Sequence, residues 1–293
     1  MTVTITKEEN EKALECVLRS RGFSKRLITR LKRTENGMTR KGVLIRTVDL
    51  VYENDIIMIN EGDGEALDPN PDLKADILYE DSEVVVFSKP PFMPCHPSIK
   101  HRDDTLGNLF AALYPSLAFR PVNRLDRNTS GLVLAGKSMQ GSRELSQMIK
   151  DRTLEKYYIT VAKGKIEHDS SVCGLLIKDE ASNKVSVRPL DTDTVVESDE
   201  RFIRTDYRVL GHGEDYTVLE VHLITGRPHQ IRAHLAMLNH PVLGDYKYGD
   251  RRINEKYKLK DQLLHAYRIV LPGGREYRAV VPPKLELFTR GIL

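Results

Sequence analysis

The chain has 293 residues, of which 40% are hydrophobic and 30% charged, and its formal net charge is +3. These values are typical of a globular protein of about two domains. No apolar run approaches the roughly 18 residues that a membrane-spanning helix needs, and the polar N-terminus is unlike a signal peptide. We therefore expect a cytoplasmic protein with no membrane partner. Its cysteines, Cys16, Cys95 and Cys173, lie far apart, which argues against a disulfide framework and a structural zinc site.

Basic charge is concentrated near the N-terminus. Ten basic residues fall between Arg19 and Arg46, and only Glu35 opposes them within that stretch. Ser24 is a suitable N-cap for a helix. In that helix Leu27, Ile28 and Leu31 lie on one face, and the opposite face is cationic. An ordinary solvated helix face is the alternative, but the excess of cations favours a small α+β RNA-binding domain over residues 1–62. The basic residues that we expect to contact RNA are Lys25, Arg26, Arg30 and Arg33.

An acidic stretch follows this basic domain. Nine acidic residues lie between Glu61 and Glu83, against Lys74 alone. Together with its prolines and glycines, this composition predicts a linker over residues 63–76 and a second domain over residues 77–293. In that domain, β-rich runs alternate with turn residues and a few helical segments. We predict an α+β fold with a central, mostly antiparallel mixed sheet and flanking helices.

The segment NRLDRNTSGLVL, residues 123 to 134, joins a charged loop to an apolar strand. Asp126 lies between Arg124 and Arg127, and a polar turn follows it. Loops of this kind, fixed by a rigid scaffold, commonly present functional side chains. By itself the segment also fits an ordinary turn with solvated arginines.

A second segment, LITGRPHQIRAHLAMLNHPVLGDYKYG, begins at Leu223. Thr225-Gly226 predicts a turn, Pro228 suits the first position of a helix, and Asn239 can adopt the left-handed cap that ends it. Arg232 lies at the margin of the buried helix face. A half-buried arginine needs an anionic partner, and Asp126 is the candidate.

Three histidines of this segment, His229, His234 and His240, raise the possibility of a metal site. Only His229 and His234 fall in the predicted helix. They are five residues apart and so lie on different faces, unlike the i, i+4 pair of zinc proteases. We therefore predict packing or RNA contacts for these histidines and no bound metal.

Four segments resemble, in their order along the chain, the motifs of the RluA-type pseudouridine synthases. They are NRLDRNTSGLVL, the KYY at 156–158, TGRPHQIRAHL with HPVLGD, and the LLHA at 263–266. The resemblance covers residues 76 to 290. The basic domain resembles the RNA-binding domain of a small-subunit ribosomal protein of the S-four kind, with the NDI at 54–56 at its closing edge. Together they imply the pseudouridine synthase fold and isomerisation of uridine in structured RNA, without cofactor or metal. Ribosomal RNA of the large subunit is the first expectation and transfer RNA the second.

The resemblance also implies roles for individual residues. Asp126 matches the catalytic aspartate, which attacks either the ribose or the uracil ring, and Arg232 matches the arginine that pairs with it. The residues implied to hold the flipped nucleotide are Arg124, which inserts into the RNA, Tyr158, which stacks on uracil and handles a proton, and Leu264 or its neighbour Leu263, which lies under the base. One position departs from the family, because Asn123 replaces the usual histidine before Arg-Leu-Asp.

Base flipping explains why such residues are needed, since a glycosidic bond inside stacked RNA is inaccessible and an aromatic platform offsets part of the cost. The main alternative is a non-catalytic RNA-binding or ribosome-assembly factor on a synthase scaffold. A glycosidase needs two acids that flank the bond, and we expect Asp245 merely to occupy a turn. The small-subunit type of pseudouridine synthase matches the motifs less well. We expect a monomer.

Overall fold

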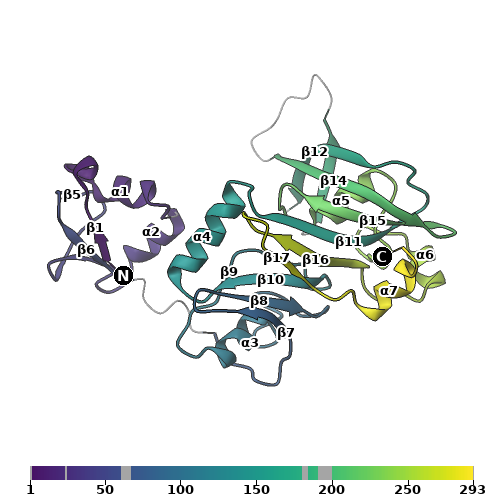
Figure 1. Ribbon diagram of the computed structural model, residues 1–293, viewed down its shortest axis with the longest axis horizontal. Helices are drawn as coiled ribbons and strands as arrows, with labels where there is room; N and C mark the ends of the chain where they lie inside the picture. The colour runs from purple at the N-terminus through teal and green to yellow at the C-terminus, as the bar shows by residue number, and fades with distance from the viewer. Residues whose placement is uncertain (1, 24, 61–66, 180–183, 191–199, 293) are drawn as a thin grey trace. The chain divides into compact units, whose positions relative to one another are not determined.

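A computed structural model describes residues 2–23, 25–60, 67–179, 184–190 and 200–292 (Figure 1). The chain divides into two units. The smaller comprises Met1–Leu67 with Ser116–Ala118, and the larger Asp68–Pro115 with Phe119–Leu293. The predicted N-cap Ser24, the side chain of Arg26 and the first part of the predicted linker lie outside the described residues.

The smaller unit is an α+β structure with two short helices. One sheet has the strand order β1-β6-β3-β4, and a second pairs β2 with β5. Its elements are β1 (Thr2–Thr4), the 3-10 helix η1 (Lys7–Glu9), β2 (Lys12–Ala13), α1 (Leu14–Ser20), α2 (Lys25–Leu31), β3 (Met38–Arg40), β4 (Val43–Leu44), β5 (Leu50–Val51) and β6 (Ile56–Ile59). The positive φ of Asn54, 66°, forms the turn that enters β6.

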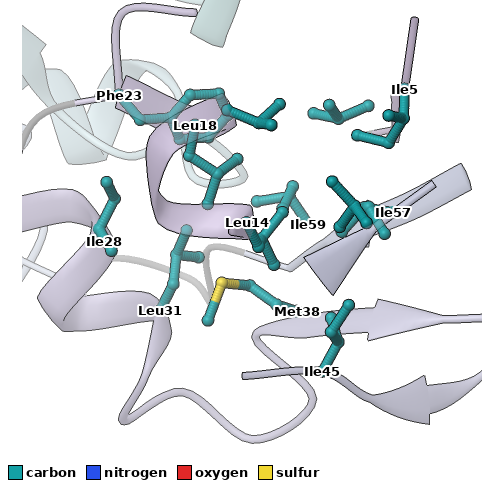
Figure 2. Close-up of a cluster of buried hydrophobic side chains, with 13 residues drawn as sticks. Ile5, Leu14, Leu18, Phe23, Ile28, Leu31, Met38, Ile45, Ile57 and Ile59 are labelled. Carbon is teal, nitrogen blue, oxygen red and sulfur yellow. The ribbon is translucent and has the colours of Figure 1, made fainter. Parts of the chain in front are cut away.

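Apolar side chains of both helices and of the sheet form the core of the smaller unit (Figure 2). Leu14 and Leu18 of α1 and Ile28 and Leu31 of α2 are all at most 1% exposed, and Ile57 of β6 is completely buried. The helical spacing of these residues therefore matches the face that packs, as the sequence predicted for α2.

Part of the positive charge of this unit is balanced by its own acidic residues. Acids from outside the basic stretch pair with several of its cations, as Glu9 does with Arg21 and Asp55 with Arg40. Further pairs among the described residues join Glu15 with Arg19 and Lys32, and Asp49 with Arg46. On and just beyond α2, Lys25, Arg30 and Arg33 are exposed, so the α2 surface keeps its basic character.

The larger unit is built on a mixed sheet of eleven strands (Figure 1). Its order is β13-β12-β14-β15-β11-β16-β10-β8-β7, with β17 paired to β16 and β9 to β10. Among the strands that the structure describes, only β10 and β16 pair in parallel. The strands are β7 (Asp76–Glu80), β8 (Val84–Lys89), β9 (Arg120–Pro121), β10 (Ser130–Gly136), β11 (Glu155–Lys163), β12 (Ser170–Asp179), β13 (Lys184–Pro189), β14 (Arg201–His212), β15 (Tyr216–Leu223), β16 (Leu264–Val270) and β17 (Glu276–Arg278).

Helices cover this sheet on several sides. Phe110 of α3 lies against Phe87 of β8, with ring centroids 6.4 Å apart, while Leu145 of α4 packs with Leu132 of β10. The helices are α3 (Leu106–Leu113), α4 (Met139–Lys150), α5 (Gln230–Met237), α6 (Arg251–Lys256) and α7 (Pro283–Thr289). The predicted α+β class and mostly antiparallel mixed sheet are confirmed. No helix among the described residues is long and apolar enough to span a membrane.

The parallel pairing of β10 with β16 requires a glycine. Ser130 lies opposite His265 and Gly131 opposite Ala266. Gly131 has φ +111°, and a Cβ atom there would be 2.2 Å from the carbonyl oxygen of Ala266. Only glycine tolerates both the backbone conformation and this approach. The pairing brings Leu264, at the start of β16, close to the loop that precedes β10.

Candidate active site

Asp126 lies in the loop between β9 and β10, which turns tightly before the strand. The amide of Thr129 donates a hydrogen bond to the carbonyl of Asp126 at 3.1 Å. Asn123 fixes the start of the loop to β10, because its side chain donates to the carbonyl of Leu132 at 2.9 Å and accepts from the amide of Leu134 at 2.8 Å. The asparagine that departs from the family pattern is therefore a structural support of the loop.

Two buried residues lie beneath the same loop. The ammonium of Lys89 donates to the carbonyls of Pro90, Met93 and Arg127, the last at 3.2 Å. The amide of Leu125 donates to Sγ of Cys95 at 3.3 Å. Burial lowers the pKa of Lys89 to about 8, although the nearby Cys95 and Asp126 favour its charged form. These contacts hold the backbone on both sides of Asp126.

Arg232 reaches Asp126 from helix α5. The helix begins at Gln230, and its N-cap His229 is left-handed with φ 54°. The prediction that Pro228 takes the first helical position is wrong, because residues 225–229 form a turn around the Gln230 side chain, whose Oε1 accepts from Thr225 and from the amide of Arg227. Arg232 is 7% exposed, so it is buried rather than marginal. The predicted left-handed cap at Asn239 is confirmed, with φ 63°.

The guanidinium of Arg232 lies between two carboxylates. Its Nη1 is 2.7 Å from Oδ2 of Asp126. On the other edge, Nε and Nη2 donate to Oδ2 and Oδ1 of Asp245 at 2.7 and 2.9 Å. Burial disfavours the charge of Arg232, but the hydrogen bonds to Asp245 and the charges of both aspartates outweigh it and raise the pKa of Arg232. The arginine is thus a permanent cation beside Asp126.

Asp245 is part of this site, and the prediction that it merely occupies a turn is wrong. Its side chain is completely buried, and it also accepts from the amides of Lys247 and Tyr248 at 2.8 and 3.1 Å. Burial raises the pKa of Asp245, but these bonds and Arg232 outweigh that effect and lower it. The sequence does place an acid, Asp245, shortly after the helix that carries the buried Arg232. This spacing alone does not show that the two residues pair.

His229 also lies near the Asp126 carboxylate. Its Nε2 is 3.9 Å from Oδ2 of Asp126, and its Nδ1 is 2.8 Å from the hydroxyl of Tyr248. Burial lowers the pKa of His229, against the charge of Asp126, which raises it. The other two histidines considered for a metal lie elsewhere. Nδ1 of His234 contacts Thr205 at 2.9 Å, and Nδ1 of His240 contacts the carbonyl of Lys163 at 2.8 Å.

An open cavity of about 910 Å³ surrounds Asp126. Tyr158 and Leu264, which are both 5% exposed, contribute to its lining, as does the exposed Arg124. Leu263 instead belongs to the apolar cluster that includes Phe288 of α7. Burial raises the pKa of Tyr158, and the charge of Asp126 adds to the shift. Tyr158 is therefore a neutral phenol at pH 7.

The cavity is strongly cationic. Among the described residues that line it, seven are lysine or arginine and one, Asp126, is acidic. Since that single acid is paired with Arg232, the remaining charge attracts anions. The basic residues are Arg124, Arg127, Lys150, Arg152, Lys156, Arg227 and Arg232. Asp126, Tyr158, Arg232, Arg124 and Leu264 thus meet at one cavity, whereas Lys25, Arg30 and Arg33 belong to the smaller unit.

Comparisons with known proteins agree with this geometry. The profile of the family described as RNA pseudouridylate synthase matches residues 83–237. The chain is 34% identical to ribosomal large subunit pseudouridine synthase D of Borreliella burgdorferi over 209 residues, which cover 68% of the chain and 61% of that relative. It is 33% identical to the Xylella fastidiosa protein of the same name over 213 residues, which cover 71% and 62%. The chain thus spans less than two thirds of the length of these relatives.

Two solved human structures share the fold. Human RNA Pseudouridylate Synthase Domain Containing 1 matches with a TM-score of 0.61 and 22% identity, over 75% of the chain and 90% of that structure. Human RNA Pseudouridylate Synthase Domain Containing 4 gives 0.59 and 22%, over 71% and 89%. At this identity the likeness concerns the fold alone.

Proposed function

The chain belongs to the RNA pseudouridylate synthase family, and from this premise we propose that it isomerises specific uridines of RNA to pseudouridine. One observation on this chain supports the proposal most directly. Arg232 donates to Asp126 at 2.7 Å in the wall of a cavity whose other charged lining residues, among those that the structure describes, are cations. A cation fixed beside a carboxylate stabilises its negative charge when substrate excludes water, which suits a nucleophile.

The reaction leaves the atomic composition of the RNA unchanged. The bond between C1′ of the ribose and N1 of uracil breaks, the base turns, and a bond forms between C1′ and C5. The proton on C5 is lost and N1 gains one, so the product is an isomer. Asp126 attacks either the ribose or the uracil ring to free the base.

The remaining cavity residues suit the handling of a flipped base. Tyr158 is a buried, neutral aromatic ring on which uracil can stack, at a gain of about 1–3 kcal/mol. Leu264 supplies an apolar surface under the base. The exposed Arg124 is free of the buried network around Arg232 and can fill the space that the flipped nucleotide leaves in the RNA.

The substrate that we propose is ribosomal RNA of the large subunit, in agreement with the names of the relatives from Borreliella and Xylella. We further propose that the smaller unit is an RNA-binding domain of the S-four kind, which acts through Lys25, Arg26, Arg30 and Arg33. Two helices over a small sheet and the exposed cations of α2 support this role. We expect a cytoplasmic monomer, and the non-catalytic RNA-binding factor remains the alternative outcome of the test.

The test measures tritium release from unmodified large-subunit ribosomal RNA labelled at C5 of uridine. The wild-type protein should release the label, and Asp126→Ala should abolish release while RNA binding persists. Asp151→Asn removes an exposed carboxylate at the end of α4 and serves as the matched control with full activity. Tight binding without release by the wild-type protein would favour the non-catalytic alternative.

A further inference from the structure

Lys156 is a buried lysine that faces the active-site cavity. It lies on β11 two residues before Tyr158, so both side chains extend from the same face of the strand. Lys156 is 9% exposed, and it lines the same cavity as Asp126 and Tyr158. In most proteins a lysine this deeply buried has an anionic partner.

The ammonium of Lys156 has no such partner among the residues that the structure describes. No described residue forms a hydrogen bond or an ion pair with it, and Asp126, the acid of the cavity, is held by Arg232. Burial lowers the pKa of Lys156, and no neighbouring acid opposes the shift. A buried charge without a counter-ion is costly, so its presence at a substrate cavity indicates that the partner comes from the ligand.

We propose that Nζ of Lys156 binds a phosphate oxygen of the RNA backbone next to the flipped uridine, which makes Lys156 a substrate-positioning residue. This inference rests on the proposed function. The neutral carbonyls of uracil leave a buried ammonium uncompensated, whereas a phosphate supplies a full counter-charge and a charge-assisted hydrogen bond. Arg152 and Arg227 line the same cavity and are exposed, so they extend the cationic path toward solvent.

Gly226 gives room for this contact. A Cβ atom built on Gly226 would lie 3.2 Å from Nζ of Lys156, so the ammonium rests close against the bare backbone of the turn before α5. A methyl group there would crowd the ammonium and the oxygen that it binds. Gly226→Ala should therefore weaken phosphate binding in the same direction as loss of Lys156, but to a smaller extent.

The first experiment measures the salt dependence of RNA binding by the full chain. In an Asp126→Ala background, which prevents turnover, unmodified large-subunit ribosomal RNA is bound at increasing salt by the parent protein and by its Lys156→Met and Lys165→Met derivatives. Lys165 is an exposed lysine paired with Glu167 outside the cavity. Loss of one phosphate contact should reduce the slope of log affinity against log salt by about 0.7–0.9. We expect this for Lys156→Met alone, and an unchanged slope would overturn the proposal.

The second experiment identifies the chemical group that Lys156 binds. The NMR signal of its ¹³C-labelled Cε is followed during titration with uridine 5′-monophosphate, uridine 3′-monophosphate and uridine. The nucleotide that carries the phosphate bound by Lys156 should raise the pKa of Lys156, whereas uridine should not. A larger response to uridine 5′-monophosphate or to uridine 3′-monophosphate then identifies the phosphate on one side of the target. An equal response to uridine would mean that Lys156 binds the base, and the proposal would be wrong.

The two proposals can fail separately. If Lys156 responds to the nucleotides but the protein releases no tritium from RNA, the phosphate site is supported and the proposed function is wrong. If the wild-type protein releases tritium but Lys156→Met leaves the slope of log affinity against log salt unchanged, the proposed function is supported and the phosphate site is wrong.

Discussion

Asp245 accepts two hydrogen bonds from one edge of the Arg232 guanidinium, at 2.7 and 2.9 Å, which leaves Nη1 directed at Asp126. A two-point contact fixes the plane of an arginine as well as its position. Tyr248 adds a third restraint, since its ring centroid lies 5.1 Å from the guanidinium carbon. Arg232 therefore holds the Asp126 carboxylate in one orientation before any substrate binds.

Asp245→Asn should lower the rate of tritium release by roughly 100-fold, because a small displacement of a catalytic group has an effect of that size. An amide keeps the shape of the side chain but removes its charge and one of its two acceptor oxygens. Removal of one partner of a buried ion pair should also reduce the free energy of unfolding by about 3–5 kcal/mol. Single-turnover kinetics and urea denaturation measure the two effects.

Asp250→Asn is the matched control for this variant. Asp250 pairs with Lys163 on the surface and caps α6, a role that asparagine also fills. We expect less than about 1 kcal/mol of destabilisation and normal tritium release. If Asp245→Asn behaved like this control, Asp245 would not be the residue that orients Arg232.

Asn123→Ala should destabilise the protein by about 1–3 kcal/mol, because it leaves a buried amide and carbonyl of β10 without their partner. The loop that carries Asp126 would lose its attachment to Leu132 and Leu134, so tritium release should also fall. Urea denaturation and the release assay test this together. Wild-type stability of the alanine variant would show that Asn123 is not a support of the loop.

Stability should decrease as the pH falls from about 6.5 toward 4. Burial lowers the pKa of His234 and of His265 to about 4, whereas both titrate near 6.5 in the unfolded chain. Between these values the unfolded state binds more protons than the native state, so acid favours unfolding. Each histidine should contribute roughly 1–3 kcal/mol to this loss.

The double variant His234→Gln, His265→Gln isolates this effect. Glutamine keeps a polar group that can reach Thr205 or Ser130, the partners of the two rings, but does not titrate. Urea denaturation at pH 7, 6, 5 and 4 should show a shallower loss of stability for the double variant. Parallel curves for the two proteins would assign the acid sensitivity to other groups.

The sequence could predict the parts of the site that one segment carries, and it predicted less well what depends on contacts between segments. The charged loop before a buried strand indicated Asp126, and the need of a buried arginine for an acid indicated its pairing with Arg232. The contact of Asp245 with Arg232 could not be predicted, because it joins two positions 13 residues apart through the path of the chain after α5. The smaller unit gives a similar case, since Glu9 and Asp55 neutralise cations that are distant in sequence.

The parallel pairing of β10 with β16 has a consequence for how the protein folds. The residues that this pairing joins, Ser130 and His265, are separated by 135 positions, and contacts of such long sequence separation form slowly. The strand that follows the Asp126 loop gains its parallel partner only after β16 has been synthesised and has inserted beside β10. A nascent chain that ends before Leu264 can therefore already contain Asp126 and Arg232 and still lack the assembled candidate site.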